Sequence, residues 1–172
     1  TGPPGCGKST LLSIMGLMDT ASEGDYKISD IDTRGLKVDQ RTQIRNQHIG
    51  YVFQSFNLID HLTVFDNIAL PLEHRKTNKE EIKQRVEKVL SQVDMLHRKN
   101  YRPNQLSGGQ QQRIAIARCL VMNPEVIICD EIVSALDVSV QAQVLNLLQD
   151  LQDELKLSYL FISHDLSVVK HT

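Results

Sequence analysis

The spacing of apolar residues along the chain predicts both helices and strands. In four segments the apolar residues recur every three or four positions, as on one face of a helix. In three others they form a short run, as in a buried strand. The expected helices are residues 8–17, 82–93, 114–121 and 140–155, and the expected strands are residues 48–53, 126–129 and 159–162. Residues 19–47 are polar and turn-rich, and we assign them no helix or strand.

The order of these segments predicts an α/β fold. The amphipathic helix at 140–155 lies between two predicted strands, and a strand–helix–strand connection of this kind joins parallel strands. Thr77 followed by Glu80 has the pattern of a capping box, which predicts where the helix containing residues 82–93 begins. We therefore expect a mainly parallel sheet flanked by helices.

Composition and charge narrow the class of function. The chain has 172 residues, of which 41% are apolar and 23% charged, as in one ordinary globular domain. Its net charge of -2 gives no broad attraction to nucleic acid or anionic lipid. It has neither a spanning apolar run nor a signal-peptide layout at its start, so we expect a cytoplasmic protein that meets a membrane only through a partner. The cysteine spacing predicts no disulfide or zinc site.

A phosphate-binding loop is predicted at the start of the chain. The residues that fit its pattern, G-x-x-x-x-G-K-[ST], are Gly2, Pro3, Pro4, Gly5, Cys6, Gly7, Lys8 and Ser9. In such a loop the glycines let backbone amides turn toward phosphate oxygens at a helix N-terminus. We expect Lys8 to bridge the β and γ phosphates, Ser9 to place its hydroxyl on Mg²⁺, and Thr10 to add a donor toward phosphate. A chance match is expected in fewer than about 1 in 100 chains of this length.

Two carboxylates follow the predicted strand at 126–129. Asp130 and Glu131 would lie at the carboxyl end of a buried strand, which is the edge where ligands bind in open α/β sheets. Asp130 suits the shell of a Mg²⁺ ion, through water, and Glu131 suits the general base for the water that attacks the γ-phosphate. Taken alone, the pair could equally start a turn or cap a helix. The phosphate-binding loop in the same chain favours the catalytic interpretation.

A serine and two glycines precede the predicted helix at 114–121, within Leu106-Ser107-Gly108-Gly109-Gln110. Ser107, Gly108 and Gly109 would expose backbone amides at the positive end of that helix, which makes a second anion site. A plain N-cap would also explain the serine. The combination with the other two motifs favours anion binding.

Together these motifs resemble the ATP-binding cassette (ABC) transporter ATPases over essentially the whole chain. They occur in the family's order: phosphate loop at 2–9, Q-loop glutamine Gln54, LSGGQ signature at 106–110, Walker B strand to Asp130 with Glu131, SALD loop at 134–137, and switch histidine His164. The resemblance implies a P-loop NTPase fold, in a single partial domain covering residues 1–172. Residues 1–54 and 107–172 would form its RecA-like core and about 55–106 a helical subdomain.

The resemblance also implies a mechanism. The chain would be the nucleotide-binding subunit that hydrolyses ATP with Mg²⁺ and drives transport through a separate permease at the cytoplasmic face of the membrane. Two cassettes, identical or paralogous, would close head to tail, so that Ser107 to Gln110 of one completes the ATP site of the other. Gln54 would join the Mg²⁺ and water shell and couple to the permease. Asp137 would act across the dimer interface, and His164 would contact the γ-phosphate.

Each of the last three residues also has a simpler interpretation. Gln54 could be only a polar strand end, and Asp137 could be only the N-cap of the following helix. A lone histidine after an apolar run, such as His164, is more often structural than functional. Their order relative to the other motifs favours the functional interpretation.

The sequence departs from the family pattern in three respects. Ile132 stands where the family usually has proline, which removes a backbone restraint beside Glu131. The family's β-rich segment before the phosphate loop and its strands after the switch histidine have no counterpart, so we expect a cassette truncated at both ends, less stable and weaker in nucleotide binding. The first half is similar to lipoprotein-release and macrolide-export cassettes, and the second half to dipeptide and oligopeptide importers.

Two other functions are weighed against the transport ATPase. One is an ATP-binding fragment without turnover of its own, which is compatible with the same ancestry. The other is a DNA-associated ABC-type ATPase. That class inserts a long coiled coil between the first motif and the signature, whereas this chain has no sustained heptads and a slightly negative charge, so no nucleic-acid partner is expected.

Overall fold

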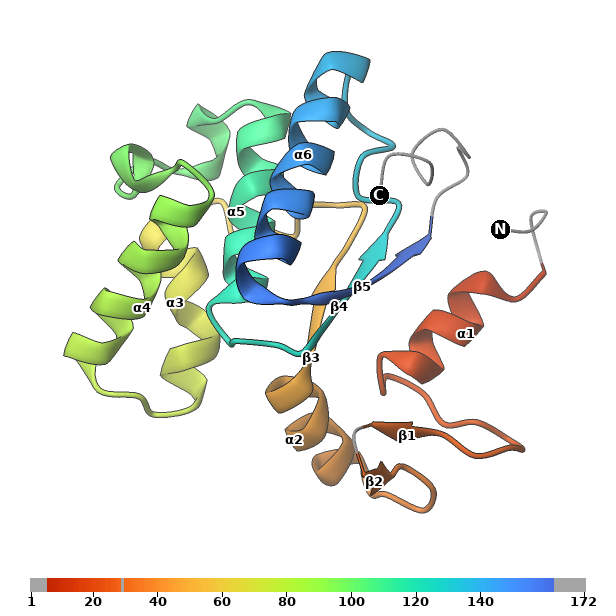
Figure 1. Ribbon diagram of the computed structural model, residues 1–172. Helices are drawn as coiled ribbons and strands as arrows, with labels where there is room; N and C mark the ends of the chain where they lie inside the picture. Colours follow the sequence, from red (N-terminus) through yellow and green to blue (C-terminus); the bar gives the residue numbers. More distant parts are fainter. Residues whose placement is uncertain (1–5, 29, 163–172) are drawn as a thin grey trace.

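A three-stranded parallel sheet lies at the centre of the computed structural model, which describes residues 6–28 and 30–162 (Figure 1). Its strands, in the order β3–β4–β5, are β3 (Ile49–Val52), β4 (Val126–Asp130) and β5 (Ser158–Ile162). Gly50 lies opposite Ile127 of β4, and Ile127 lies opposite Tyr159 of β5. The predicted parallel sheet is confirmed, and β4 is paired on both sides.

Helices surround this sheet, and a small antiparallel hairpin lies beside it (Figure 1). The helices are α1 (Lys8–Met15), α2 (Val38–His48), α3 (Val64–His74), α4 (Lys79–Gln92), α5 (Gly108–Leu120) and α6 (Val138–Leu155), with short 3₁₀ turns η1 (Leu96–Arg98) and η2 (Pro103–Gln105). The hairpin pairs β1 (Lys27–Ile28) with β2 (Ile31–Asp32). α3, α4 and α5 pack on one another, and α5 also contacts α6 and β3.

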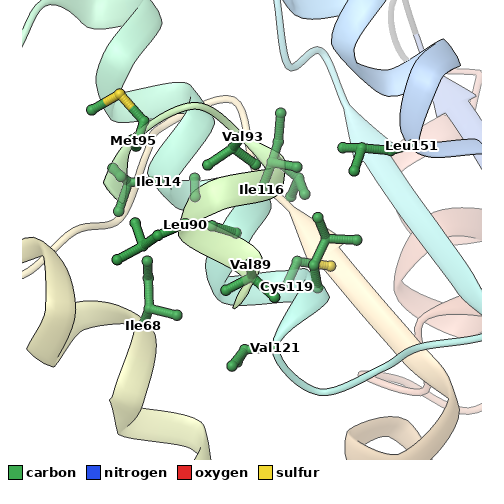
Figure 2. Close-up of a cluster of buried hydrophobic side chains, with 14 of the residues drawn as sticks. Ile68, Val89, Leu90, Val93, Met95, Ile114, Ile116, Cys119, Val121 and Leu151 are labelled. Atoms are coloured by element: carbon green, nitrogen blue, oxygen red, sulfur yellow. The ribbon is translucent and has the colours of Figure 1, made fainter. Parts of the chain in front are cut away.

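The main hydrophobic core lies where α3, α4, α5 and α6 meet the sheet. Figure 2 shows Ile68 of α3, Leu90 of α4 and Ile114 of α5 directed into one cluster, and all three are fully buried. Burying a side chain of this size stabilises the fold by about 1.5–3 kcal/mol. The apolar stripe predicted for residues 82–93 is buried along its whole length. A second cluster joins Leu12 of α1 to Ile128 of β4.

α2 lies in the stretch to which the sequence pattern assigned no element. Of its eleven residues only Ile44 is buried, so the segment carries no apolar stripe to signal a helix. Its start is fixed instead by Gln40, whose side-chain oxygen accepts a hydrogen bond from the Lys37 amide at 2.9 Å. Asp39 in the first turn also favours the positive end of the helix.

The predicted capping box at Thr77 was wrong by one position. Asn78 is the N-cap of α4, and its side-chain oxygen accepts a hydrogen bond from the Glu81 amide at 2.8 Å. The Thr77 amide is already used, because it donates to the Leu72 carbonyl at 3.2 Å in the turn that ends α3. Thr77 therefore belongs to the end of one helix and Asn78 to the start of the next.

α3 was not singled out from apolar spacing, although two signals were present. Thr63 and Asp66 form a reciprocal capping box, with the Asp66 amide 3.1 Å from the Thr63 hydroxyl. Val64, Ile68 and Leu72 then follow at helical spacing, and all three are fully buried.

Gly50 of β3 lets α5 pack directly onto the sheet, and this close approach yields a test. A Cβ at this position would lie 1.9 Å from the Cys119 sulfur of α5. We expect Gly50→Ala to lower the free energy of unfolding of the intact protein by about 1–3 kcal/mol, because overpacking forces the helix or strand to shift. Urea unfolding would measure the loss.

The double variant Gly50→Ala/Cys119→Ala is the matched control. Removing the Cys119 sulfur makes room for the new methyl group, so the double variant should recover most of the stability lost by Gly50→Ala. An unchanged midpoint for Gly50→Ala, or no recovery in the double variant, would contradict this account of the packing.

Candidate functional site

Asp130 and Glu131 are held at the carboxyl edge of the sheet by backbone pairing. Asp130 is the last residue of β4 and lies opposite Ile162 of β5. The Glu131 amide donates to the Ile162 carbonyl at 3.0 Å, which carries the pairing one residue beyond the strand. Both side chains are half-buried. Two carboxyl groups are thus presented at the edge where the sequence predicted them.

Glu131 has an unusual backbone conformation. Its φ of 51° lies in the left-handed region, which costs a residue with a Cβ about 1–3 kcal/mol. The chain after it turns at once, since the Ser134 amide and hydroxyl donate to the Glu131 carbonyl at 3.0 and 2.8 Å. Ile132 and Val133 are 3% and 4% exposed. Burial of these two side chains anchors the turn at the position where the family usually has proline.

Tyr51 of β3 contacts the same edge and was not singled out from the sequence. Its hydroxyl donates to the Asp130 carboxylate at 3.5 Å. Burial, with the neighbouring negative charge of Asp130, raises the pKa of Tyr51 to about 12, so the phenol remains a proton donor at neutral pH. The sequence offered one signal for Tyr51, a side chain that ends in a hydroxyl group within an otherwise apolar strand.

Gln54, which follows β3, comes to this edge from 80 positions away in the sequence. Its side-chain nitrogen donates to the Ser134 hydroxyl at 3.2 Å. Ser134 lies in the segment from Glu131 to Asp137, which we call the 131–137 loop. On the other side of that loop, Gln141 of α6 donates to the Leu136 carbonyl at 2.9 Å. The structure therefore brings Gln54, Asp130, Glu131 and the SALD residues together.

The described part of the phosphate loop leads into α1. Gly7 is the N-cap of α1 with φ 86°, a left-handed conformation that glycine adopts without a Cβ clash. Lys8 begins the helix, and its Nζ donates to the Cys6 sulfur at 3.6 Å. Ser9 and Thr10 follow in the first turn. Gly2, Pro3, Pro4, Gly5 and His164 lie outside the described residues.

The signature segment forms the N-terminus of α5. Ser107 and Gln110 make a reciprocal capping box: the Gln110 amide donates to the Ser107 hydroxyl at 3.4 Å, and the Ser107 amide donates to the Gln110 side chain at 3.0 Å. Gly108 and Gly109 are the first two helical residues. A Cβ on Gly109 would lie 2.4 Å from a Val140 methyl, so glycine permits the close approach of α6.

A cavity of about 340 Å³ opens beside this helix start. Its lining includes Ser107, Gly109 and Gln110 together with the basic residue Arg113 and the acidic residue Asp94. A positive helix end with a neighbouring guanidinium group suits an anion. The N-cap role and the anion-binding role of Ser107 are therefore compatible.

Asp137 occupies the N-cap position of α6, as the simpler interpretation predicted. Its side chain nevertheless makes no capping hydrogen bond, and it is exposed. The carboxylate of Asp137 is therefore accessible at the surface beside the 131–137 loop.

Gln112 of α5 is a further polar residue near this site that sequence reasoning missed. Its side chain is fully buried, and within residues 6–28 and 30–162 neither its amide nitrogen nor its amide oxygen has a hydrogen-bond partner. A buried polar group left in this state costs about 1–3 kcal/mol. In the sequence, Gln112 is indistinguishable from the exposed or half-exposed polar residues before it.

The donor set at the sheet edge fits a Mg²⁺ ion that arrives with a nucleotide. Across the described parts of the chain, no three His, Cys, Asp or Glu side chains gather where they could hold a metal ion. Mg²⁺ that arrives with a nucleotide takes most of its ligands from phosphates and water, and needs only one or two oxygen ligands from the protein. The Asp130 carboxylate and the Gln54 amide oxygen are ligands of that kind.

No described helix is long and apolar enough to span a membrane.

Comparisons with known proteins agree with this geometry. The family model described as "ABC transporter" matches residues 1–134. The methionine import ATP-binding protein MetN 2 of Bacillus cereus is 45% identical over 166 residues, which are 96% of this chain and 49% of that protein. MetN of Escherichia coli O157:H7 is 44% identical over 169 residues, 98% of this chain and 49% of that protein. The chain thus spans about half the length of these curated relatives.

Two solved structures have the same fold. An ATP-binding cassette solved as a dimer in a post-hydrolysis state, bound to ADP and Pi, superposes with a TM-score of 0.84 at 41% identity, covering 99% of this chain and 75% of that one. CbiO1 of Clostridium perfringens, part of the ABC transporter complex cbiONQ, gives a TM-score of 0.89 at 30% identity, covering 98% and 66%. From the matched motifs, the sheet edge and these similarities, the chain belongs to the ABC transporter family and carries its ATP-binding cassette fold.

Proposed function

We propose that this chain is the nucleotide-binding module of an ABC transporter and that it hydrolyses ATP to drive a transport step. The observation that carries the proposal is the grouping of Asp130, Glu131 and Gln54 at one edge of a parallel sheet, with Gln54 joined through Ser134 to the loop that follows Glu131. General bases and metal ligands drawn from separate strands meet in this way at the carboxyl edge of open α/β sheets.

Binding of ATP is assigned to the start of the chain and the sheet edge. The loop from Gly2 to Gly7 wraps the phosphates with its backbone amides, and Lys8 neutralises their charge. The Thr10 hydroxyl adds a donor. Ser9, Gln54 and Asp130 would hold Mg²⁺, Asp130 through water. When bound, the ion neutralises charge on the β and γ phosphates.

Hydrolysis is assigned to Glu131, which takes a proton from the water that attacks the γ-phosphate. The left-handed backbone of Glu131 and the hydrogen bond from the Ser134 amide to the Glu131 carbonyl fix the direction in which the Glu131 side chain leaves the backbone. Gln54 orients the same water, and His164 contacts the γ-phosphate. The Tyr51 hydroxyl donates a hydrogen bond to the Asp130 carboxylate.

Closure of the site is assigned to a second cassette, a copy of this chain or a paralogue. Ser107, Gly108, Gly109 and Gln110 of that cassette present their helix N-terminus to the nucleotide held by the first. Asp137 acts across the same interface. The exposure of the signature cavity and of Asp137 supports this arrangement, and so does the dimeric state named for a similar cassette.

The remaining partner is a transmembrane permease at the cytoplasmic face. Residues 1–54 and 107–172 form the nucleotide-binding core, and about 55–106 the helical subdomain that meets the permease. A cavity of about 510 Å³ between β3, α3 and α5 is lined by apolar residues such as Leu70 and Met122 together with the basic residues Arg75 and Arg118. A groove that offers both kinds of side chain suits an amphipathic helix of a partner protein. Import is the direction favoured by the names of the relatives.

Glu131→Gln tests the assignment of the general base. In the intact protein this substitution should lower the ATPase turnover number at least about 100-fold, since it removes the proton acceptor but keeps the shape of the side chain. Binding of Mg-ATP should be retained, and the trapped nucleotide should shift the protein toward a dimer. A coupled ATPase assay and light scattering would measure the two effects.

Glu23→Gln, on the exposed loop before β1, is the matched control and should leave turnover unchanged. Wild-type turnover in Glu131→Gln, or ATP hydrolysis absent from the wild-type protein, would refute the proposed function.

Mixing two inactive variants tests the shared site. Lys8→Ala removes the phosphate lysine, and Ser107→Arg fills the signature, so neither variant alone should hydrolyse ATP. A mixed dimer contains one intact site, built from the phosphate loop of one chain and the signature of the other. An equimolar mixture should therefore regain roughly a quarter of the wild-type rate if subunits exchange at random. No recovery on mixing, with exchange verified by differently tagged subunits, would count against a shared site.

A further inference from the structure

Gln112 lies on the face of α5 that meets the 131–137 loop and α6. A Cβ on Gly108 would lie 3.2 Å from a methyl carbon of Leu136 in that loop, and a Cβ on Gly109 would contact Val140. Gln112 is four positions after Gly108 and three after Gly109, so it lies on the same face of the helix, one turn further on. Side chains in helices lean toward the N-terminus. We therefore expect the Gln112 side chain to lean back toward the turn of α5 that faces Leu136 and Phe56.

Two other glutamine side chains already hold this loop by hydrogen bonds. Gln54 donates to the Ser134 hydroxyl at 3.2 Å, and Gln141 donates to the Leu136 carbonyl at 2.9 Å. Gln112 lies one turn along α5 from Gly108, where Leu136 of this loop packs, and its amide makes no hydrogen bond within the described residues. Of the three amides, it alone is both fully buried and unsatisfied in the part of the chain that the structure describes.

An apolar residue would suit this position better if packing were its only role. Ile116, one turn after Gln112 on α5, is fully buried, and so is Val144 of α6, which lines the cavity beside the start of α5. Replacing an unsatisfied buried amide by an apolar side chain of the same shape is neutral or stabilising. An unsatisfied buried amide calls for an explanation, and a partner gained in another conformation of the loop would supply one.

We propose that Gln112 is a positioning residue for Glu131. In the conformation described here its amide is unsatisfied. When the 131–137 loop moves to its hydrolysis-competent arrangement, the amide hydrogen-bonds the loop and holds Glu131 toward the attacking water. The missing hydrogen bond raises the free energy of the resting conformation, and the hydrogen bond formed on closure lowers that of the active conformation. Both effects shift the loop equilibrium toward the active conformation. This inference rests on the proposed ATPase function.

Gln112→Met is the direct test, because methionine has nearly the same length and shape and lacks the amide. In the intact protein without nucleotide, the melting temperature should rise by about 2 °C or more. The ATPase kcat should fall about tenfold, the rate equivalent of one hydrogen bond lost on reaching the transition state, while KM for ATP stays within about twofold. Gln149→Met, the same change at an exposed position of α6, is the control and should alter neither quantity.

A rise in melting temperature together with a fall in kcat distinguishes a positioning role from a structural one. If Gln112→Met lowers the melting temperature, the amide has partners in the resting state and the inference is overturned. An unchanged kcat overturns it as well, and leaves the proposed function standing as long as Glu131→Gln is inactive. If the wild-type protein has no ATPase activity, the proposed function itself fails, and the fall or rise in melting temperature alone decides whether the amide is unsatisfied.

Discussion

The candidate site depends on β4 being paired on both sides. Ile127 and Cys129 are buried in the main core and Ile128 in the second cluster, so a change of strand register would move these side chains out of their clusters. This register makes Asp130 the last paired residue of β4. The hydrogen bond from the Glu131 amide to the Ile162 carbonyl of β5 then fixes the position of Glu131. Glu131, and Gln54 through its hydrogen bond to Ser134, are positioned relative to that strand end.

α5 connects this edge to the rest of the molecule. Its C-terminal half packs on β3 through the contact of Cys119 with Gly50, and its N-terminus carries the signature beside α6. Gly108 and Gly109 allow the 131–137 loop and α6 to approach closely, and Gln112 lies one turn later on that face. One helix therefore carries a proposed contact to a second cassette at its start and a buried amide behind the catalytic loop, so that closure of the dimer and the position of Glu131 can be coupled.

Much of this arrangement could be predicted from the sequence, and the exceptions have physical causes. The buried stripe of α4 and the strand before Asp130 have strong apolar patterns, because burial is what produces the pattern. α2 buries only Ile44, so its sequence has no apolar pattern that predicts a helix. Tyr51 and Gln112 were missed because their importance comes from tertiary contacts: a partner on a neighbouring strand for Tyr51, and complete burial without a partner for Gln112. Neither property is visible in a single sequence.

The most direct test of the central claim is a crystal structure of the intact protein with Mg²⁺ and a non-hydrolysable ATP analogue. The account predicts a water molecule in line with the γ-phosphate and within about 3 Å of the Glu131 carboxylate, with the 131–137 loop now bonded to the Gln112 amide. A closed, nucleotide-bound structure in which Glu131 points away from that water and another side chain takes its place would contradict it.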